Sequence, residues 1–429
     1  METGFETPNF LLSSNIYEVN VRQYTPEGTF EAFAKHLPRL KHMGVEILWF
    51  MPIHPIGLVN RKGSLGSYYS VRDFKDVNPE FGSKADFDLL VNQIHALDMK
   101  IIIDWVANHA AWDNVWTLDN PNFFLRDELG VFKNAFDWDD VIQINHECDE
   151  EQNAMIDAMK YWVEKHNIDG FRADLAHLTP LAFWIKARTH LTSIKQNLIW
   201  LAETEEPNYH KAFDISYTWK WMHEVELFCK GDKTLVDCIN VLKWQKAAFT
   251  TTAQRMFFTS NHDENSWNGT EYEKYGKAVK NLAVFGSTFI GITMLYSGQE
   301  LPNTKRLPFF DKDEIAWQPI NELHTFYKTL LEFRKKIALY KNASINDVYF
   351  YEEYLSENIL AYKIEKDDET VLVFLNFTDD YKSITVNDEI KNLHYKNLFT
   401  EEIMLLDNLT LIKISPFDNL VLVKNYCNA

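Results

Sequence analysis

No stretch of eighteen consecutive apolar residues occurs in the 429-residue sequence, so a membrane-spanning helix is not expected. Cysteine is scarce as well: the 4 cysteines include no CxxC pair and no Cys/His cluster with the spacing of a zinc site. We therefore expect free, reduced thiols at Cys148, Cys229, Cys238 and Cys427. The first residues, METGFETPNFLLSS, lack the basic and apolar regions of a signal peptide, which favours a cytoplasmic location.

Basic residues are outnumbered, because 43 Lys and Arg stand against 62 Asp and Glu, for a formal net charge of -19. Nucleic-acid binding usually needs a basic patch, so this balance argues against a nucleic-acid partner. An acidic surface keeps a protein soluble and is compatible with an uncharged ligand. Most of the surplus carboxylates are expected to be solvated surface groups.

The remaining composition is that of a globular protein with a core of normal size. Hydrophobic residues make up 46% and charged residues 24% of the chain. The length suits a large barrel with one further module. Aromatic residues reach 14%, including 13 Trp, and these rings serve either core packing or ligand binding in a cleft.

Short apolar runs alternate with helical patterns over the first 340 residues. Residues 29–43, 149–164 and 272–285 have helical character, and Gly44 follows the first as a helix-ending glycine does. Eight β/α units predict a TIM barrel, since buried parallel strands read as apolar runs. The strand candidates are residues 16–20, 45–50, 101–104, 168–174, 199–203, 213–216, 256–260 and 293–296.

Two changes in the residue pattern divide the chain into three predicted regions. Residues 109–146 have no clear helical period, and so long a connection predicts a small insertion after the third barrel strand. After the barrel, residues 341–429 hold short β-rich runs at 348–354, 360–364, 370–377, 409–414 and 420–423. We expect this part to be an antiparallel β-sandwich. The barrel itself then comprises residues 1–108 and 147–340.

Polar residues gather where the predicted barrel strands end. The ends of parallel barrel strands face one mouth, where the active sites of this fold lie. A single strand-end Asp is usually a helix cap, but several such ends are harder to explain that way. The ends of the predicted strands bring together Asp104, Asn108, His109, Arg172, Asp174, Glu203, His262 and Asp263.

Two carboxylates in one cleft are what glycoside cleavage needs, one as nucleophile and one as acid and then base. Arg172 lies two residues before Asp174, on the same face of its strand, and is expected to lower the pKa of that carboxyl. Glu203 would need a raised pKa, because the acid must hold a proton. Asp104 is expected to orient Arg172 as structural support.

Four sequence blocks resemble those of the α-amylase family, glycoside hydrolase family 13. They are DWVANH (104–109), GFRAD (170–174), LAE (201–203) and FTSNHDENSWNG (258–269), and they occur in the family's order. SYYSVRD (67–73) and YSGQE (296–300) extend the match, and the C-terminal region resembles the family's third domain. The stretches at 201–207 and 305–310 look most like members from Bacteroidetes-type bacteria.

The resemblance implies a role for each matching position. Asp174 corresponds to the nucleophile, Glu203 to the acid/base, and Asp263 to the third carboxylate. Other matched residues are implied to line the site around the cleaved sugar, and these are Tyr69, His109, Arg172 and His262. No cofactor is implied for the chemistry.

The chain departs from the family pattern at two places. Many members have a Lys-His pair after the nucleophile, where this sequence has His177 and Leu178, so His177 is a candidate substrate-binding residue or a structural histidine. The insertion is also short. Asn108 matches a calcium ligand of many members, but Ca²⁺ needs six to eight oxygens. Asp113, Asp119, Asp137, Asp139 and Asp140 could supply some of them, or belong to a solvated loop.

The function that the resemblance implies is retaining hydrolysis of α-1,4-linked glucans or maltooligosaccharides. Two alternatives remain open at this point. A transferase on the same scaffold would pass the sugar to another sugar instead of water. A non-catalytic relative could act as a binding protein, although such relatives typically lose carboxylates that this chain keeps. The short insertion favours an open cleft.

Overall fold

The computed structural model describes residues 5–319, 321–385, 393–406 and 410–424. Eight parallel strands close into a barrel in the order β1-β11-β10-β9-β8-β7-β3-β2, which confirms the predicted TIM barrel. Each predicted strand overlaps an observed one. The barrel strands are β1 (Asn15–Val19), β2 (Ile47–Phe50), β3 (Lys100–Trp105), β7 (Gly170–Ala173), β8 (Ile199–Ala202), β9 (Ile215–Tyr217), β10 (Gln254–Phe257) and β11 (Ile292–Tyr296).

Apolar side chains fill the barrel interior, and a second apolar layer lies between the barrel and its helices. Interior residues such as Ile47, Leu201 and Met256 are fully buried. This packing explains why the strands are apolar along their whole length. The surrounding helices are α1 (Val21–Tyr24), α2 (Phe30–Ala34), α3 (Leu37–Met43), α4 (Lys84–Ala96), α6 (Asp149–Lys165), α7 (Leu181–Thr192), α8 (Trp219–Lys230), α9 (Leu235–Ala248), α10 (Glu271–Tyr275), α11 (Val279–Thr288), α12 (Glu322–Lys336) and α13 (Leu339–Asn342).

Two predicted helices are interrupted in the structure. The segment 29–43 forms α2 and α3 with a break between them, and Pro38 lies in the first turn of α3, where its missing N–H costs little. Gly44 ends α3 with a positive φ of 97°, as the sequence predicts. The segment 272–285 is divided at Gly276, whose φ is 54°.

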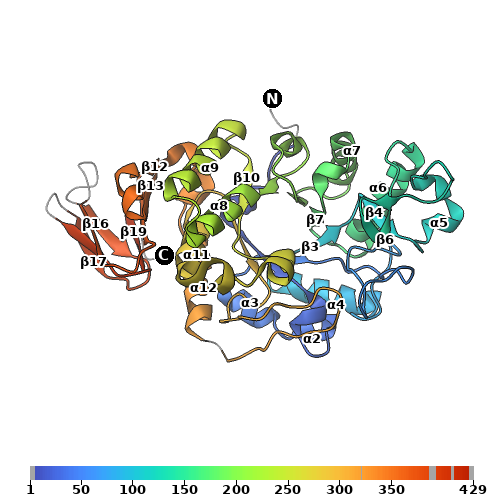
Figure 1. Cartoon of the computed structure of the whole chain (residues 1–429), viewed down its shortest axis with the longest axis horizontal. Helices are drawn as coiled ribbons and strands as arrows, with labels where there is room; N and C mark the ends of the chain where they lie inside the picture. Colours follow the sequence, from blue (N-terminus) through green and yellow to red (C-terminus); the bar gives the residue numbers. More distant parts are fainter. Residues whose placement is uncertain (1–4, 320, 386–392, 407–409, 425–429) are drawn as a thin grey trace.

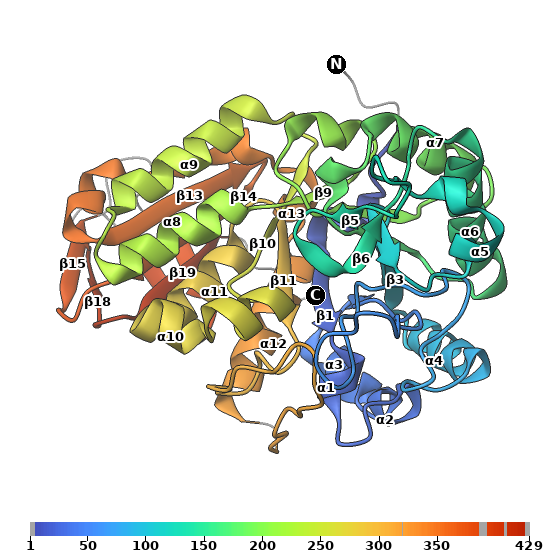
Figure 2. The same ribbon diagram turned by 45° about the vertical axis from the view of Figure 1, so that its right-hand side comes forward.

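A small sheet lies within the predicted insertion after β3. It has the order β4-β6-β5 and contains β4 (His109–Ala111), β5 (Asn134–Ala135) and β6 (Trp138–Gln143), with the short helix α5 (Trp116–Asp119) beside it. The insertion and the C-terminal sheets lie at opposite ends of the barrel, at the right and left of Figure 1 and again in Figure 2.

The C-terminal region is antiparallel, as predicted. One sheet has six strands in the order β12-β13-β14-β19-β16-β17, and a second pairs β15 with β18. The sequence patterns missed β15, β16 and β17, and the predicted run 409–414 begins at a residue outside the described part. The strands are β12 (Val348–Phe350), β13 (Ile359–Lys366), β14 (Glu369–Asn376), β15 (Lys382–Thr385), β16 (Leu393–Asn397), β17 (Ile403–Leu406), β18 (Leu411–Ile414) and β19 (Asn419–Lys424).

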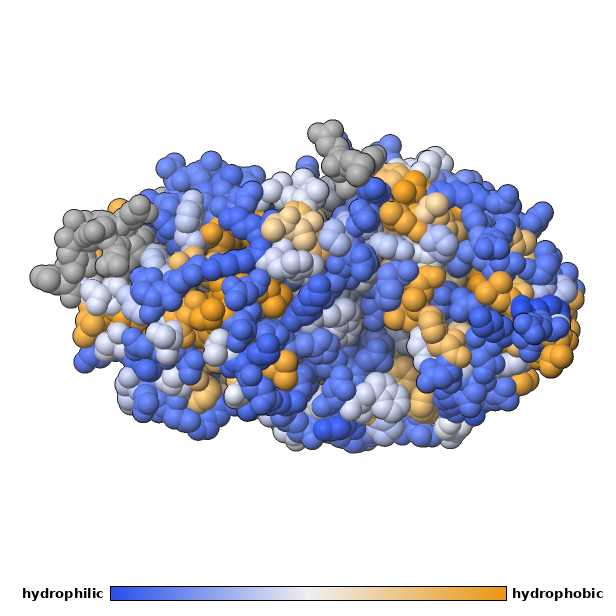
Figure 3. Space-filling model, turned by 45° about the horizontal axis from the view of Figure 1, so that its top comes forward, coloured by the Kyte–Doolittle hydropathy of each residue, from blue (hydrophilic) through white to orange (hydrophobic). Residues whose placement is uncertain are grey.

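Two predictions about the whole chain can be compared with the described residues. Cys148, Cys229 and Cys238 are free thiols, while Cys427 lies outside the described part. Among the helices of the described ranges, none combines the length and apolar character needed to cross a membrane. Hydrophilic residues cover most of the face in Figure 3, with apolar residues in scattered patches.

Candidate active site

A single buried arginine holds three carboxylates together at the barrel mouth. Arg172, on β7, is fully buried, and its Nη1 lies 2.9 Å from Asp104 Oδ1 and 3.0 Å from Asp174 Oδ1. Its Nη2 lies 2.8 Å from Glu203 Oε2. The predicted contact between Asp104 and Arg172 is therefore present, and strand register explains it, because Asp104 on β3 is paired with Arg172 on β7. Asp174 and Glu203 follow β7 and β8 directly.

The environment of Asp174 differs from the sequence prediction. Burial raises the pKa of Asp174; Arg172 lowers it, while Glu203 and Asp104 raise it further, and the net pKa lies well above the usual value. Arg172 does lower the pKa of Asp174, as the sequence predicts, but burial outweighs this effect, so the carboxyl is not kept below its usual pKa. Asp174 Oδ2 is buried and has no hydrogen-bond partner among residues 5–319 or the other described segments.

Leu175, directly after Asp174, has a left-handed backbone with φ 39°. Such a conformation is unfavourable for a leucine and occurs mostly where function requires it. Here it points the backbone N–H of Leu175 at Glu203, where it donates to Oε2 at 2.8 Å. The turn therefore links the segment after β7 to the carboxylate after β8.

His262 joins the two sides of the barrel mouth through contacts of both its ring nitrogens. His262 Nδ1 lies 2.5 Å from Glu18 Oε1, its Nε2 lies 2.7 Å from the Tyr69 hydroxyl, and Asp263 Oδ2 is 3.3 Å away. Burial lowers the pKa of His262, but Asp263 and Glu18 outweigh burial and raise the pKa to about 9. His262 is thus a cation at neutral pH, and its ring stacks on Tyr69 with centroids 5.4 Å apart.

Glu18 is a site residue that the sequence analysis missed. It lies on β1, is fully buried, and supports His262 from below. A signal was available, since it is the one charged residue in an otherwise apolar or aromatic strand run, Ile16 to Val19.

His109 lies at the start of β4, where the insertion leaves the barrel. Burial lowers the pKa of His109 to about 4, so the ring is neutral at physiological pH. Its ring meets Trp138 of β6 edge to face at 5.4 Å. The insertion therefore contributes both a polar and an aromatic side chain to the site.

A cleft of about 270 Å³ opens above these residues. Tyr69, His109, Asp174, Glu203 and Asp263 line it, as the sequence predicts for one shared site. Arg172 and His262 support its floor through the contacts above. His177 does not belong to this lining: it is exposed on the short 3₁₀ turn Ala176–Leu178, which carries its side chain out to solvent.

Aromatic walls of the cleft were missed by the sequence analysis. Trp138 comes from the insertion, whereas Trp267, Phe309 and Phe310 come from loops after β10 and β11. Trp267 is 53% exposed and packs against Phe309 and Phe310 with centroids 5.5 and 5.6 Å away. Aromatic rings of this kind bind the apolar faces of sugars.

An unusual turn presents Trp267. Residues Glu264–Asn268 form a single π-helical turn, a conformation found mostly at functional sites. The turn also fixes the neighbouring loop, since Asn265 Oδ1 accepts from Leu307 N at 2.9 Å and Ser266 Oγ donates to Leu307 O at 2.7 Å. The two loops thus form one wall.

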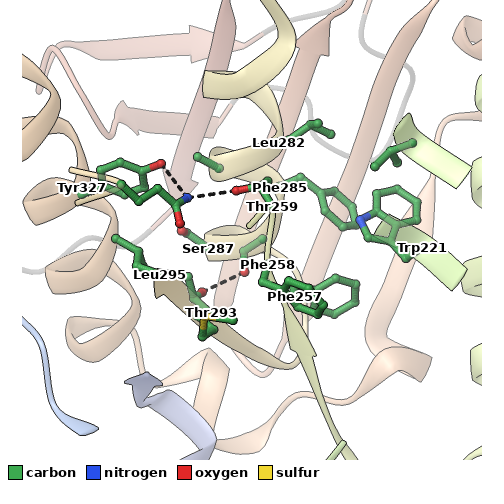
Figure 4. Close-up of a pocket in the computed structure, with 15 residues that line it drawn as sticks. Trp221, Phe257, Phe258, Thr259, Leu282, Phe285, Ser287, Thr293, Leu295 and Tyr327 are labelled. Atoms are coloured by element: carbon green, nitrogen blue, oxygen red, sulfur yellow. Dashed lines mark hydrogen bonds between the residues drawn. The ribbon is translucent and has the colours of Figure 1, made fainter. Parts of the chain in front are cut away.

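A second, small cavity between the barrel and α11 cannot hold a sugar (Figure 4). Its volume is about 20 Å³, which is room for about one water. Within it, Gln299 Nε2 donates to the Tyr327 hydroxyl at 3.0 Å and to Thr259 Oγ1 at 2.9 Å. This network packs the barrel wall.

Comparison with known proteins decides the family. The sequence profile of the α-amylase catalytic domain matches residues 13–211. The solved structure of a maltogenic α-amylase from Thermotoga neapolitana is 31% identical, with a TM-score of 0.88 over 97% of this chain and 99% of that one. The chain belongs to the α-amylase family.

Further relatives support this assignment over the full length. An α-amylase structure from Lactobacillus plantarum is 27% identical, covers 97% of this chain and 100% of its own, and has a TM-score of 0.88. Alpha-amylase 3 of Dictyoglomus thermophilum is 24% identical over 93% of this chain and 92% of its own length. The resemblance to Bacteroidetes-type members stays a prediction.

The calcium site that α-amylase family membership suggests does not fit the residues of this chain. Both oxygens of Asn108 accept from Gln143 Nε2, the side-chain Oδ1 at 2.9 Å and the backbone O at 2.8 Å. Asp139 and Asp140 contact the Lys62 ammonium at 3.1 and 2.8 Å.

The other candidate ligands are engaged or solvated. Asp113 pairs with Arg72 at 3.1 Å, and Asp119 and Asp137 are exposed. Within the described residues, no group of three or more His, Cys, Asp or Glu side chains could hold a metal ion. Apart from the solvent-exposed Asp119 and Asp137, the candidate oxygens in this α-amylase family member therefore face hydrogen-bond donors or cationic side chains.

Proposed function

We propose that this protein is a retaining glycoside hydrolase that cleaves α-1,4-glucosidic bonds in α-glucans or maltooligosaccharides. The observation that carries the proposal is the shared guanidinium of Arg172, which contacts Asp174 and Glu203 at once. The shared guanidinium holds both carboxylates in one part of the cleft, as a nucleophile and an acid/base acting on the same bond must be.

Asp174 is the proposed nucleophile. Its unpartnered Oδ2 attacks the anomeric carbon while Glu203 donates a proton to the departing glycosidic oxygen. The bond from the anomeric carbon to that oxygen breaks, and a bond to Asp174 forms. In the second half, Glu203 takes a proton from water, the water oxygen attacks the same carbon, and Asp174 leaves as a carboxylate.

The proton content of the free site suits this sequence of steps. The mechanism needs one proton on the pair, held by Glu203, and an ionised Asp174. Crowded carboxylates that share one cation retain a proton to higher pH than isolated ones, which is the direction seen for the pKa of Asp174.

The surrounding residues have proposed supporting roles. Asp263 and the cationic His262 would bind hydroxyls of the sugar at the cleavage point, and His109 would bind a further hydroxyl as a neutral donor. The Tyr69 ring would stack on the apolar face of that sugar. Asp104 acts indirectly, because it positions Arg172 through contacts of 2.9 and 3.1 Å.

A glucan transferase is the second candidate, and the comparisons favour keeping it. A maltose-1-phosphate maltosyltransferase of Cereibacter sphaeroides is 32% identical over 41% of this chain and 29% of its own length. The covalent intermediate would be the same, and only the acceptor would differ. A non-catalytic binding protein, the third reading, does not account for the retained carboxylates.

A product profile with maltoheptaose, pullulan and soluble starch tests the proposal. Shorter maltooligosaccharides as the only products are expected for a hydrolase, and their distribution separates endo from exo action. Products longer than maltoheptaose would indicate a transferase. No change in any substrate, with folded protein, would contradict both. The cytoplasmic location, the open cleft and the absence of a nucleic-acid or membrane partner stay predictions.

A further inference from the structure

The junction between the barrel and its insertion is held by hydrogen bonds whose directions can be deduced. Gln143 lies on β6 directly opposite His109 on β4, and its Nε2 is 2.8 Å from the Asn108 backbone oxygen. A backbone carbonyl only accepts, so the end of the Gln143 side chain that faces it must be the NH₂ group. β6 lies beside β3 in Figure 2.

The same NH₂ group fixes the orientation of Asn108. Gln143 Nε2 also lies 2.9 Å from the side chain of Asn108, so the atom it meets there must be the acceptor Oδ1. The Nδ2 of Asn108 consequently faces His109 Nδ1, at 3.3 Å. Because an amide NH₂ only donates, Nδ1 of His109 accepts, and the ring hydrogen stays on Nε2.

We propose that the Gln143 side-chain amide occupies the role of a structural cation at this junction and, through Asn108, positions the ring of His109. The two hydrogens of one neutral NH₂ group reach both oxygens of a residue that is 1% exposed, and the backbone oxygen also accepts from Ile144 N at 3.1 Å. Gln143 is a positioning residue, since its contacts reach His109 only through Asn108.

The charges around the insertion agree with this assignment. A cation site needs several unengaged oxygens. Lys62 instead holds Asp139 and Asp140, and Arg72 holds Asp113, so each of these carboxylates already has a cationic partner. The stability of the junction should therefore not depend on a divalent ion.

Changing Gln143 to Glu turns the donor into an acceptor and creates an oxygen cluster. In Gln143→Glu, a carboxylate would face both Asn108 oxygens, which is unfavourable without a cation between them. In EDTA we expect the melting temperature of Gln143→Glu to fall by about 5 °C, and millimolar CaCl₂ to restore most of it. Wild type should melt at the same temperature in EDTA and in CaCl₂.

Two further variants separate the role of the amide from a general effect of substitution. Gln143→Met keeps the approximate length without a donor, so its melting temperature should fall in both buffers and not respond to calcium. Gln152→Glu is the matched control, because Gln152 also donates to a backbone carbonyl, that of His146 at 2.7 Å, but away from Asn108. It should show no calcium response.

Two results would overturn the proposal. One is a lower melting temperature of wild type in EDTA than in CaCl₂, and the other is a Gln143→Glu protein that ignores calcium. A second readout rests on the proposed function: well below melting, kcat/KM of Gln143→Glu on maltoheptaose should drop about 10-fold in EDTA and recover in calcium. If the protein has no hydrolase activity, the melting experiment still decides the role of Gln143.

Discussion

Two buried aspartates on either side of one barrel strand show opposite electrostatics. Asp169 and Asp174 flank β7, and each is 5% exposed. Burial raises the pKa of Asp169, but a hydrogen bond from His95, the Lys195 ammonium and the Ile101 N–H outweigh it, and the pKa is lowered. For Asp174, burial and three neighbouring carboxylates prevail, and the pKa is raised.

The number of donors around each carboxylate explains the difference. Asp169 has His95 Nε2 at 2.7 Å and Ile101 N at 3.0 Å on one oxygen, and Lys195 at 3.0 Å on the other. Asp174 shares a single guanidinium with its neighbours and keeps one oxygen without a partner in the described residues. Equal burial thus gives a stabilising group at one end of the strand and a reactive group at the other.

The largest expected effect is on turnover. Asp174→Asn should lower kcat on maltoheptaose by about 10⁴-fold or more, because an amide cannot form the covalent intermediate, while the fold survives. Asp169→Asn should keep kcat within about threefold at a temperature where it is folded. Steady-state kinetics with circular dichroism checks both. An Asp174→Asn protein with most of its activity would show that the nucleophile lies elsewhere.

The second effect is on stability and its pH dependence. Asp169 has a lowered folded pKa, so its stabilisation is present at neutral pH and lost as the pH falls through the acid range. Asp169→Asn should cost about 3 kcal/mol near pH 7 and much less near pH 3. Asp174 has the opposite pH dependence: its contribution to stability is fully present below its unfolded pKa of about 4 and is lost as the pH rises through the raised folded pKa.

Thermal unfolding between pH 3 and pH 8 makes this contrast visible. Asp174→Asn should melt higher than wild type at pH 8, and the difference should vanish in acid. If both Asn variants lost stability in parallel with pH, the proposed electrostatic contrast between the strand ends would fail.

The third effect concerns the additional cation at the mouth, His262. Glu18→Gln removes a buried carboxylate 2.5 Å from the ring, so the pKa of His262 should fall from about 9. The alkaline limb of the kcat/KM profile should move toward neutral by about one pH unit. Glu300→Gln is the control, because Glu300 is equally buried but contacts Tyr17 and Arg39 instead. An unmoved limb in Glu18→Gln would rule out His262 as its source.

The smallest effect tests how far solvent weakens the donors around Asp169. Lys195 is 27% exposed, whereas Arg172 at the other end is fully buried. Lys195→Met should therefore cost only about 0.5–1 kcal/mol, measured by urea unfolding. A loss as large as that of Asp169→Asn would mean that Lys195, not the set of donors, lowers the pKa.

The sequence predicted more of the strand ends than of the loops between them. The runs ending at Asp104, Asp174 and Glu203 were found because apolar strands with polar ends are local patterns. The aromatic wall of Trp267 and Phe309 was not, since exposed rings in long loops have no periodicity that marks them. The sequence analysis also missed the break at Gly276, which divides the predicted helix 272–285.

The sequence by itself determined the barrel, its antiparallel C-terminal partner and the residues collected at one mouth, because apolar periodicity and strand order are properties of the chain. Only the tertiary structure decided the electrostatic state of that mouth. The pKa of Asp174 depends on how many carboxylates share Arg172, and the orientation of His109 depends on an amide from another strand. Both follow from distances between residues far apart in the chain, which no local pattern specifies.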